Sequence, residues 1–519
     1  MSANAQAVRR TAALVILATA AGALLRLPMF MTSVLGSVSP KLLWYDEAYA
    51  IFIAGRGFFE AVRLSGADTT PALFVALLSF WLRIAGGATT AVAAFPFLWS
   101  IAAIPLAYLL GREFGGAKAG LLAAALVAAD PLQVAFATEI RVYSLLSCLA
   151  ALSVLFLARH VRSGRGGDGL AWVAASLAGF YASYTFLLVF VPEAAYAVWL
   201  TRRDRAGLRR LAWYAAALAA GYLPQILLYR RWGDFFSVPG APSSFFVRGF
   251  GHGGVTAFFA YFSSMAFGPA AFYPATVAGG IVSLAAGVAA AAGLSWAAVR
   301  TWKDRRARLL AACVFGGICM AMAGRFVFAP RYYLAFVIPA AALAANALSG
   351  PKRPWAVAAP IVAALAIVSL GANRVPAPEA YKYYGRDFAQ TIATESRPGD
   401  IVLADHFTDM LFRRYPPGDA EVALFFPMRG KNVTSLDERF RWVDYDFESE
   451  ADEPTLAALT GRAERVWTVD YEPRGSSLQD PAGLKRRWLD AHFTLAEAVE
   501  FPADVPDGFQ KVVLLRYAR

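Results

Sequence analysis

Two adjacent carboxylates lie in an aromatic setting near the N-terminus. Asp46 and Glu47 belong to the segment LWYDEAYAIF, in which a tryptophan and two tyrosines flank the acids. A carboxylate held at the edge of a membrane can act as a general base or as a metal ligand. An alternative interpretation is that both acids are solvated at the start of a helix, where negative charge is favourable. The adjacent pair does not by itself distinguish these interpretations.

Two arginine–tyrosine pairs could bind an anion. Arg141 and Tyr143 lie in the segment ATEIRVYSLL, and Arg331 and Tyr332 lie in the segment APRYYLAFVIP. A guanidinium group presents parallel N–H donors that match the oxygens of a phosphate. A lone arginine at the end of a membrane span more often extends to lipid headgroups. Two such pairs on one face would suit a lipid-linked phosphate.

The composition indicates a polytopic α-helical membrane protein. Of the 519 residues, 58% are apolar and 17% are charged, against about 25% charged residues in soluble globular domains. The mean hydropathy is +0.47. These values exclude a simple soluble enzyme, a disordered chain and a disulfide scaffold. The three cysteines lie inside apolar runs, where we expect small buried side chains rather than a disulfide framework.

The charge changes sign at about residue 374. Residues 1–374 carry 31 basic and 12 acidic side chains, whereas residues 375–519 carry 18 basic and 25 acidic side chains. We therefore expect a membrane domain over 1–374, with a first outer loop at about 32–90, and a soluble domain over 375–519. The basic residues are scattered between apolar runs, which argues against a nucleic-acid partner.

The basic residues also set the predicted topology. Eleven spans place 19 of the 31 basic residues of the membrane domain on the side of the N-terminus, which we expect to be cytoplasmic. This count leaves the apolar stretches 70–86 and 254–270 along the outer interface as short amphipathic helices. An odd number of spans puts the C-terminal domain on the periplasmic or extracellular side of a cell inner membrane. The expected spans are 11–31, 91–111, 118–133, 143–159, 170–184, 185–200, 211–229, 273–299, 308–325, 332–349 and 354–371.

Residues 375–519 alternate between helical and extended patterns. A helix is expected at 387–394, and strands are expected at 400–404, 465–469 and 511–515. This order indicates an open α/β layer. Three polar residues follow the first strand, namely Asp405, His406 and Asp409. We interpret them as ordinary loop residues, and a second catalytic or metal site is the alternative.

Together these segments resemble the C-type glycosyltransferases, in particular the bacterial group related to protein O-mannosyltransferases and to lipid A aminoarabinose transferases. Four features occur in the order of that family across about 1–370. They are the acid pair at 46–47, the segment TPALFVALLSFWLRIAG from Thr70, the stretch IPLAYLLGREFGG that leads on to ATEIRVYSLL, and the run RYYLAFVIP from Arg331. Residues 375–519 resemble the small outer α/β domain that many members carry.

The resemblance implies an enzyme that moves a sugar from a polyprenyl-phosphate donor in the bilayer to an acceptor hydroxyl at the outer face, with inversion. The acceptor could be a glycan, a lipid or a protein. The resemblance further implies that Asp46 is the general base and that Glu47 orients it or binds the acceptor. The two arginine–tyrosine pairs would hold the donor phosphate and stabilise its charge as it leaves. A lipid-anchored donor needs no nucleotide-binding glycine loop, and the chain has no such motif.

The chain departs from the family at one phosphate-binding position. Many relatives carry an arginine in the second span, in a region where this chain has Ala93 and no arginine. The resemblance therefore implies that another arginine takes this role. The candidates are Arg26, Arg83 and Arg141.

Asp68 and His252 are candidate ligands of a divalent metal. Asp68 lies where some relatives place an acidic metal ligand, and His252 is the only histidine expected in the outer membrane loops. Oxygen and nitrogen ligands of this kind suit a divalent metal. Two ligands do not define a site, however, and a histidine between glycines is more often unliganded. We therefore expect no required cofactor, and a bound metal stays an alternative.

Other functions and roles stay open. A transporter or flippase of lipid-linked sugars would bind the same lipid, but internal repeats are expected of it, and the halves of the chain show no clear repeat. A scaffold whose outer domain binds a partner gives no reason for acids and arginines to gather on the outer loops. Glu193 lies inside an expected span, and we interpret it as a buried partner of a nearby polar group, with a functional acid as the alternative.

Overall fold

In the computed structural model the chain forms two compact units. The membrane unit comprises Met1–Pro40, Thr69–Arg230 and Gly240–Val375, and the C-terminal unit comprises Lys41–Asp68, Arg231–Pro239 and Pro376–Arg519. The structure describes residues 3–34, 43, 45–65, 71–228, 254–268, 277–323, 330–350, 354–372, 385–404, 408–428, 431–433, 452–472, 484–502 and 511–519.

The membrane unit is helical. Among the described residues, seven helices are long and apolar enough to cross a membrane, which confirms the predicted polytopic helical class. The seven lie in α1 (Ala3–Val34), α5 (Thr89–Ala129), α7 (Tyr143–Ser163), α9 (Leu187–Thr201), α10 (Arg205–Leu228), α14 (Val277–Thr301) and α17 (Leu334–Leu348), where α9 and α17 are each counted with the turn that precedes them. The unit also contains α8 (Gly166–Ala182) and α18 (Pro354–Ala372). Its short helices are α4 (Leu73–Ala85), α6 (Pro131–Ala135), α13 (Gly254–Phe267), α15 (Ala307–Ala311) and α16 (Gly317–Ala323), with the turns η1 (Tyr184–Phe186), η4 (Ala312–Gly316) and η5 (Pro330–Tyr333).

The predicted spans 91–111 and 118–133 are two helices that the label α5 covers together. The backbone between them leaves the helical conformation at Gly115 and Gly116, and a Cβ on Gly120 would lie 2.7 Å from the carbonyl oxygen of Tyr108, so the second helix folds back along the first. Gly116 has φ +73°, a conformation that side chains with a Cβ rarely adopt. The helix ends at Ala129 rather than 133, because Asp130 accepts a hydrogen bond from the Gln133 amide and caps α6.

The apolar stretches that were left out of the spanning set form short helices. The helix α4 has 13 residues and α13 has 14 residues. A helix of this length rises about 20 Å, whereas the hydrocarbon core of a bilayer is about 30 Å thick. Both lengths agree with leaving 70–86 and 254–270 out of the predicted spans.

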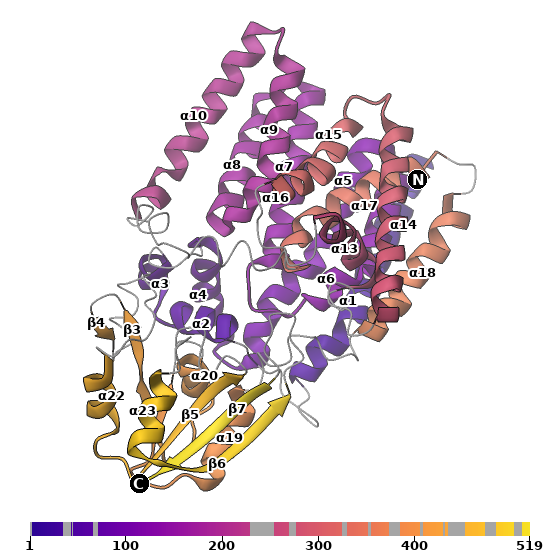
Figure 1. The fold of residues 1–519 in the computed structure, drawn as a ribbon. Coiled ribbons are helices and arrows are strands. Elements are labelled where there is room, and N and C mark those ends of the chain that lie inside the picture. Colours follow the sequence, from indigo (N-terminus) through magenta and orange to yellow (C-terminus); the bar gives the residue numbers. More distant parts are fainter. Residues whose placement is uncertain are drawn as a thin grey trace. The chain divides into compact units, whose positions relative to one another are not determined.

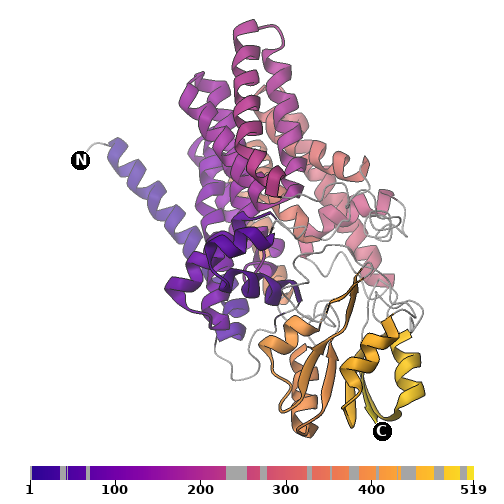
Figure 2. The same ribbon diagram turned by 90° about the vertical axis from the view of Figure 1, so that its left-hand side faces the viewer.

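The centre of the membrane unit lies around α17. This helix packs against α5, α7 and α14, and nearly all of its side chains are buried. A helix that is apolar all round is typical of the interior of a bundle. By contrast, α10 packs beside α8 and α9 and is largely exposed, as a lipid-facing helix would be (Figure 1). Figure 2 shows the same group of long helices turned by 90°.

The C-terminal unit is built on a mixed five-stranded sheet in the order β2-β1-β5-β7-β6. Strand β1 is parallel to β2 and β5, and β7 is antiparallel to β5 and β6. A hairpin of β3 (Phe426–Met428) and β4 (Lys431–Val433) forms a second sheet. The other strands are β1 (Ile401–Ala404), β2 (Glu421–Leu424), β5 (Arg465–Glu472), β6 (Thr494–Pro502) and β7 (Lys511–Ala518). The helices are α2 (Tyr45–Gly55), α3 (Phe58–Ser65), α19 (Gly385–Glu395), α20 (Asp409–Arg414), α22 (Glu453–Thr460) and α23 (Leu484–His492).

Two apolar clusters fill the two faces of this sheet. One cluster joins Phe388 of α19 to Trp467 of β5, and the other joins Leu456 of α22 and Trp488 of α23 to Tyr517 of β7. Alternate residues of the central strands therefore point to opposite helical layers, as the pleat of a strand requires. The predicted α/β layer is confirmed, and the three predicted strands are β1, β5 and β7.

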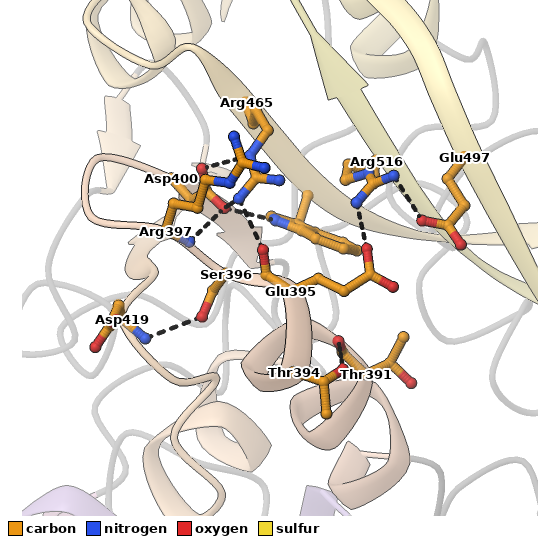
Figure 3. A network of polar contacts seen from close by, with 11 residues as sticks. Thr391, Thr394, Glu395, Ser396, Arg397, Asp400, Asp419, Arg465, Glu497 and Arg516 are labelled. Atoms are coloured by element: carbon orange, nitrogen blue, oxygen red, sulfur yellow. Dashed lines mark hydrogen bonds and ion pairs between the residues drawn. The ribbon is translucent and has the colours of Figure 1, made fainter.

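An ion-pair network joins α19 to the sheet (Figure 3). The Arg465 guanidinium donates to both carboxylate oxygens of Asp400, at 2.9 and 2.6 Å. Arg516 pairs with Glu395 at the end of α19 and with Glu497 of β6, the latter at 3.0 Å. Bidentate pairs of this kind fix geometry as well as adding energy, so the network sets where α19 ends against the sheet.

Candidate functional site

The membrane unit brings the four predicted arginine and tyrosine residues together. Arg141 immediately precedes α7 and Tyr143 is its first helical residue, whereas Arg331 and Tyr332 lie in the turn η5 that leads into α17. Since α7 and α17 pack against each other, their N-terminal ends bring the two pairs to one place. We call these four residues the Arg–Tyr cluster.

Aromatic contacts hold the Arg–Tyr cluster. The rings of Tyr143 and Tyr332 meet edge to face, with their centroids 6.0 Å apart. The guanidinium carbon of Arg331 lies 5.6 Å from the centre of the Tyr332 ring, within the range of a cation–π contact. The hydroxyl of Tyr143 also interacts electrostatically with Arg331, Arg141 and Glu139. Two positive groups and one negative group thus lie near the Tyr143 hydroxyl.

Further aromatic contacts join the turn η5 to α13. Tyr333 is buried, and its ring lies 4.2 Å from the ring of Tyr261 in α13, centroid to centroid. Tyr261 is fully buried and also packs against Phe336 of α17. The helix α13 thus contributes to the site by packing. Its sequence carries no signal of this role beyond an apolar helical pattern.

Arg26, one of the three candidates for the missing family arginine, is engaged in hydrogen bonds inside the membrane unit. Its side chain is fully buried. Its Nε donates to Ser100 at 2.8 Å, its Nη1 donates to the carbonyls of Gly22 and Ala128, and its Nη2 donates to the carbonyl of Val127. Four of the five N–H donors of a guanidinium are thereby used. Arg26 satisfies the last carbonyls of α5, as a helix C-terminus requires.

Arg141 is the remaining candidate for the missing arginine. Arg83 lies exposed in the last turn of α4. Arg141 is half-buried and belongs to the Arg–Tyr cluster. Of the three candidates, Arg141 is the one that the structure groups with Arg331.

The acid pair lies in the C-terminal unit, on the first turn of α2. Glu47 is 0% exposed, whereas Asp46 is half-buried. The helix α2 packs against α20, and the guanidinium of Arg413 in α20 lies 6.0 Å from the ring of Phe52. The backbone amide of Leu43, three residues before Asp46, donates a hydrogen bond to the Tyr415 hydroxyl at 3.1 Å.

The Glu47 carboxylate lies near the Tyr415 hydroxyl, as the charges that act on Tyr415 show. Burial raises the pKa of the Tyr415 phenol, and the negative charge of Glu47 raises this pKa further. The hydrogen bond from Leu43 and the positive charges of Arg414 and Arg386 act in the opposite direction. Glu47 is therefore held close to the residues that follow α20. The two adjacent acids consequently differ, because Glu47 is enclosed and Asp46 remains the more accessible carboxylate.

No candidate metal cluster appears in the described part of the chain, where no group of three or more histidine, cysteine, aspartate or glutamate side chains could hold an ion. The predicted ligands Asp68 and His252 lie outside the described residues, as do Asp405 and His406. Asp409 is buried at the start of α20.

Glu193 is enclosed by polar partners from neighbouring helices. It lies on α9, and its Oε2 accepts hydrogen bonds from Ser153 of α7 at 2.6 Å and from the indole of Trp172 of α8 at 2.9 Å. Ser153 also contacts Ser176 of α8 at 3.0 Å. Buried polar groups are normally bonded in this way, so the arrangement favours the structural interpretation, in which Glu193 joins three helices.

Part of the chain matches a known protein family, and its fold is similar to those of solved membrane proteins. Residues 69–227 match the family model described as dolichyl-phosphate-mannose-protein mannosyltransferase. The fold is similar to that of ArnT from Cupriavidus metallidurans bound to undecaprenyl phosphate, with a TM-score of 0.55, 13% identity, and coverage of 99% of this chain and 98% of that chain. It is also similar to the archaeal oligosaccharyltransferase AglB from Archaeoglobus fulgidus in complex with an inhibitory peptide and a dolichol-phosphate, with a TM-score of 0.53, 14% identity, and coverage of 88% and 69%. Among curated proteins, none matches the chain.

Residues 69–227 thus match this mannosyltransferase family, and the chain as a whole shares its fold with ArnT and AglB. The predicted resemblance to the C-type glycosyltransferases is confirmed as a likeness in fold, and the predicted combination of a multi-pass helical domain with a C-terminal mixed sheet is confirmed as well.

Proposed function

We propose that the protein transfers a sugar from a polyprenyl-phosphate donor to an acceptor hydroxyl at the outer face of a cell inner membrane. In this proposal the N-terminus is cytoplasmic and the C-terminal unit is periplasmic or extracellular. The observation that carries the proposal is the Arg–Tyr cluster, because it gathers two guanidinium groups at the starts of two buried helices. Support comes from the fold shared with ArnT and AglB, both of which were determined with a lipid phosphate.

The Arg–Tyr cluster would act on the departing phosphate. As the bond between the anomeric carbon and the phosphate oxygen breaks, its electron pair moves to that oxygen and adds negative charge. Arg141 and Arg331 would stabilise this charge, and Tyr143 and Tyr332 would fix the guanidinium orientation. Preformed donors are most effective in a site of low dielectric constant, and Tyr143 is only 4% exposed.

Asp46 would act as the general base. Its carboxylate would take the proton of the acceptor hydroxyl while the acceptor oxygen attacks the anomeric carbon, on the side opposite the phosphate, so that the configuration inverts. Glu47 would hold α2 in place through its buried contacts with the C-terminal unit, or would orient Asp46. General-base catalysis contributes about 10²–10⁴-fold to a rate.

The test uses a strain that lacks the gene and whose glycan profile identifies the missing product. Expression of the wild type should restore that product. The variant Asp46→Asn should accumulate in membranes to the same level and fail to restore it. The matched control is Asp419→Asn, which alters an exposed aspartate of the same unit and should restore the profile fully.

The same strain separates the enzyme from a transporter. A flippase of lipid-linked sugars needs no general base, so Asp46→Asn would restore the profile as well as the wild type does. That result would contradict the catalytic role of Asp46. Loss of the product in both Asp46→Asn and Asp419→Asn would show that the effect is not specific to the acid pair.

A further inference from the structure

A second arginine cluster surrounds a hollow at the opposite end of α7. The hollow has a volume of about 560 Å³ and lies within the membrane unit. Its charged lining residues are Arg112, Glu113, Arg159, Arg162, Arg165 and Asp168. We call it the arginine hollow, and we propose that it binds a phosphate group, carried either by the headgroup of an anionic lipid or by a soluble phosphate compound.

The charges in the arginine hollow are not balanced. The Glu113 side chain is 6% exposed, and its carboxylate lies 3.2 Å from Arg162 Nε and 3.8 Å from Arg159 Nε. Asp168 accepts a hydrogen bond from Ser163 at 2.8 Å. In the part of the chain that the structure describes, neither Arg112 nor Arg165 pairs with a carboxylate. The lining therefore carries four positive and two negative groups, with two guanidinium groups available to an anion.

A helix N-terminus adds backbone donors at the same place. The 17-residue helix α8 begins at Gly166, directly after Arg165, and Asp168 lies in its first turn. The first amides of a helix have no partner within the helix, and its dipole favours a nearby anion. A Cβ built at Gly166 or Gly167 would meet no atom within 4 Å. A phosphate can therefore approach this backbone closely, and guanidinium groups can bind its oxygens in pairs.

The positive-inside rule explains the number of arginines but not their arrangement. Scattered arginines next to a span would satisfy that rule if each pointed into solvent. Here they surround a concave space together with an enclosed carboxylate, which orients two of them. Such preorganisation lowers the entropy cost of holding a ligand.

The arginine hollow is distinct from the Arg–Tyr cluster. Tyr143 begins α7, whereas Arg159, Arg162 and Ser163 lie in its last turns. A helix of 21 residues is about 30 Å long, which separates the two groups by about the thickness of the hydrocarbon core. Phosphate binding in the arginine hollow therefore does not depend on the proposed transferase function. On the predicted topology, the arginine hollow faces the cytoplasm.

The test compares the purified full chain in a neutral detergent with a double variant, Arg112→Gln/Arg165→Gln. The control is Arg203→Gln/Arg209→Gln, which removes the same charge from exposed arginines at the start of α10. The first arm measures the rise of Tm with inorganic phosphate against chloride at equal ionic strength. The second arm measures by native mass spectrometry how much phosphatidylglycerol is retained in competition with phosphatidylcholine.

We expect the wild type and the control to show the same response in at least one arm, either a rise of Tm with phosphate or selective retention of phosphatidylglycerol. In the hollow variant, the half-saturating ligand concentration should then rise at least about tenfold. A response to phosphate identifies a soluble ligand, and selective retention of phosphatidylglycerol identifies a lipid headgroup. Equal responses of all three proteins, equal losses in both double variants, or no response of the wild type in either arm would overturn it.

A further variant keeps the test decisive if the double variant fails to fold. Gly166→Glu places a carboxylate at the first position of α8, where negative charge is favourable for a helix and the added side chain meets open space. Without ligand, this variant should have the same Tm as the wild type. It should lose the rise of Tm with phosphate, or the retention of phosphatidylglycerol, whichever the wild type shows. A retained response would contradict the proposal.

Discussion

The Arg–Tyr cluster of the membrane unit and the acid pair of the C-terminal unit are held in different ways. In the cluster, Arg331 stacks on the ring next to it in sequence, and Tyr143 meets Tyr332 where two buried helices begin. The segment that leads into the acid pair is instead held by Tyr415, which accepts a hydrogen bond from the Leu43 amide over a sequence separation of 372 residues. Helix ends and neighbouring aromatic rings thus position Arg141 and Arg331. The acid pair is positioned by residues of the C-terminal unit that are far away in the sequence.

This difference predicts unequal tolerance to change. The positions of the two arginines depend on the buried, apolar packing of α7 against α17. A single substitution of an arginine should therefore alter the charge of the cluster without moving its other members. The positions of Asp46 and Glu47 depend on a few contacts of their segment with α20 and Tyr415, so substitutions far away in the sequence should move these acids. Four expected effects sharpen or break this contrast.

The largest effect should be on the transfer rate, and it should differ between substitutions of Asp46 and of Glu47. Asp46→Asn removes the proposed base, so transfer should fall by about 10³-fold, equivalent to about 4 kcal/mol of activation free energy. Glu47→Gln keeps the shape of a buried side chain and removes its charge, so its loss should be smaller by about tenfold or more. Initial transfer rates in membranes with equal protein levels measure both. A larger loss in Glu47→Gln than in Asp46→Asn would reverse their assigned roles.

The second effect concerns the stability of the C-terminal unit. Asp400→Asn breaks the bidentate pair with Arg465 and should lower the free energy of opening β1 and β5 by about 3 kcal/mol. Burial raises the pKa of Asp400, but the hydrogen bonds from Arg465, Arg397 and Trp467 outweigh burial and hold it below its ordinary value. The folded state therefore gains stability above the unfolded pKa of about 4. That gain is lost as the pH falls through the lower folded pKa.

Hydrogen exchange of the β1 and β5 amides in the full chain measures this opening as a function of pH. The wild type should lose protection on acidification, and Asp400→Asn should show a weaker dependence. Asp419→Asn is the control and should behave as the wild type. The same acid dependence in Asp400→Asn as in the wild type would show that another group is responsible.

The third effect should appear in donor binding. Arg331→Gln and Arg141→Gln each remove a charged donor from the phosphate, which should weaken binding of undecaprenyl phosphate by about 2 kcal/mol, or about 30-fold. Arg331→Lys should retain part of the affinity, because it keeps the charge but loses the paired donors. Arg83→Gln removes an exposed arginine of the same unit and should bind normally. Equal weakening by Arg83→Gln would reveal a general effect of charge.

The smallest effect tests the distant positioning of the acids. Tyr415→Phe removes the acceptor of the Leu43 amide, so transfer should fall by about tenfold, or about 1.4 kcal/mol, with donor binding unchanged. Tyr517→Phe is the control, since it loses a bond to Asp490 at 2.8 Å elsewhere in the unit. An unchanged transfer rate in Tyr415→Phe, or an equal loss in Tyr517→Phe, would contradict this role of Tyr415.

The sequence predicted features that depend on local pattern. Apolar length and flanking charge located the helical segments, and the strands β1, β5 and β7 were predictable because they are apolar and follow clear turns. The Arg–Tyr cluster was also visible, since each pair lies at the start of an apolar run. These signals need no knowledge of distant contacts.

Features that depend on tertiary contacts were not predictable. The strand β6 was missed because, at the edge of the sheet, it is polar and largely exposed and lacks the apolar signal of a strand. Arg26 looked available for a phosphate, yet the carbonyls at the end of α5 occupy it, and these lie about 100 residues further along the chain. Likewise, nothing near Glu47 indicated that residues beyond 400 would enclose it.

The most direct measurement of the central claim separates binding from catalysis in one experiment. Native mass spectrometry of the purified full chain would give undecaprenyl phosphate binding for the wild type, Asp46→Asn and Arg331→Gln, and transfer would be assayed in parallel. The account predicts that Asp46→Asn binds the lipid as the wild type does and transfers no sugar, whereas Arg331→Gln loses most of the binding. Normal lipid binding by Arg331→Gln, or normal transfer by Asp46→Asn, would contradict it.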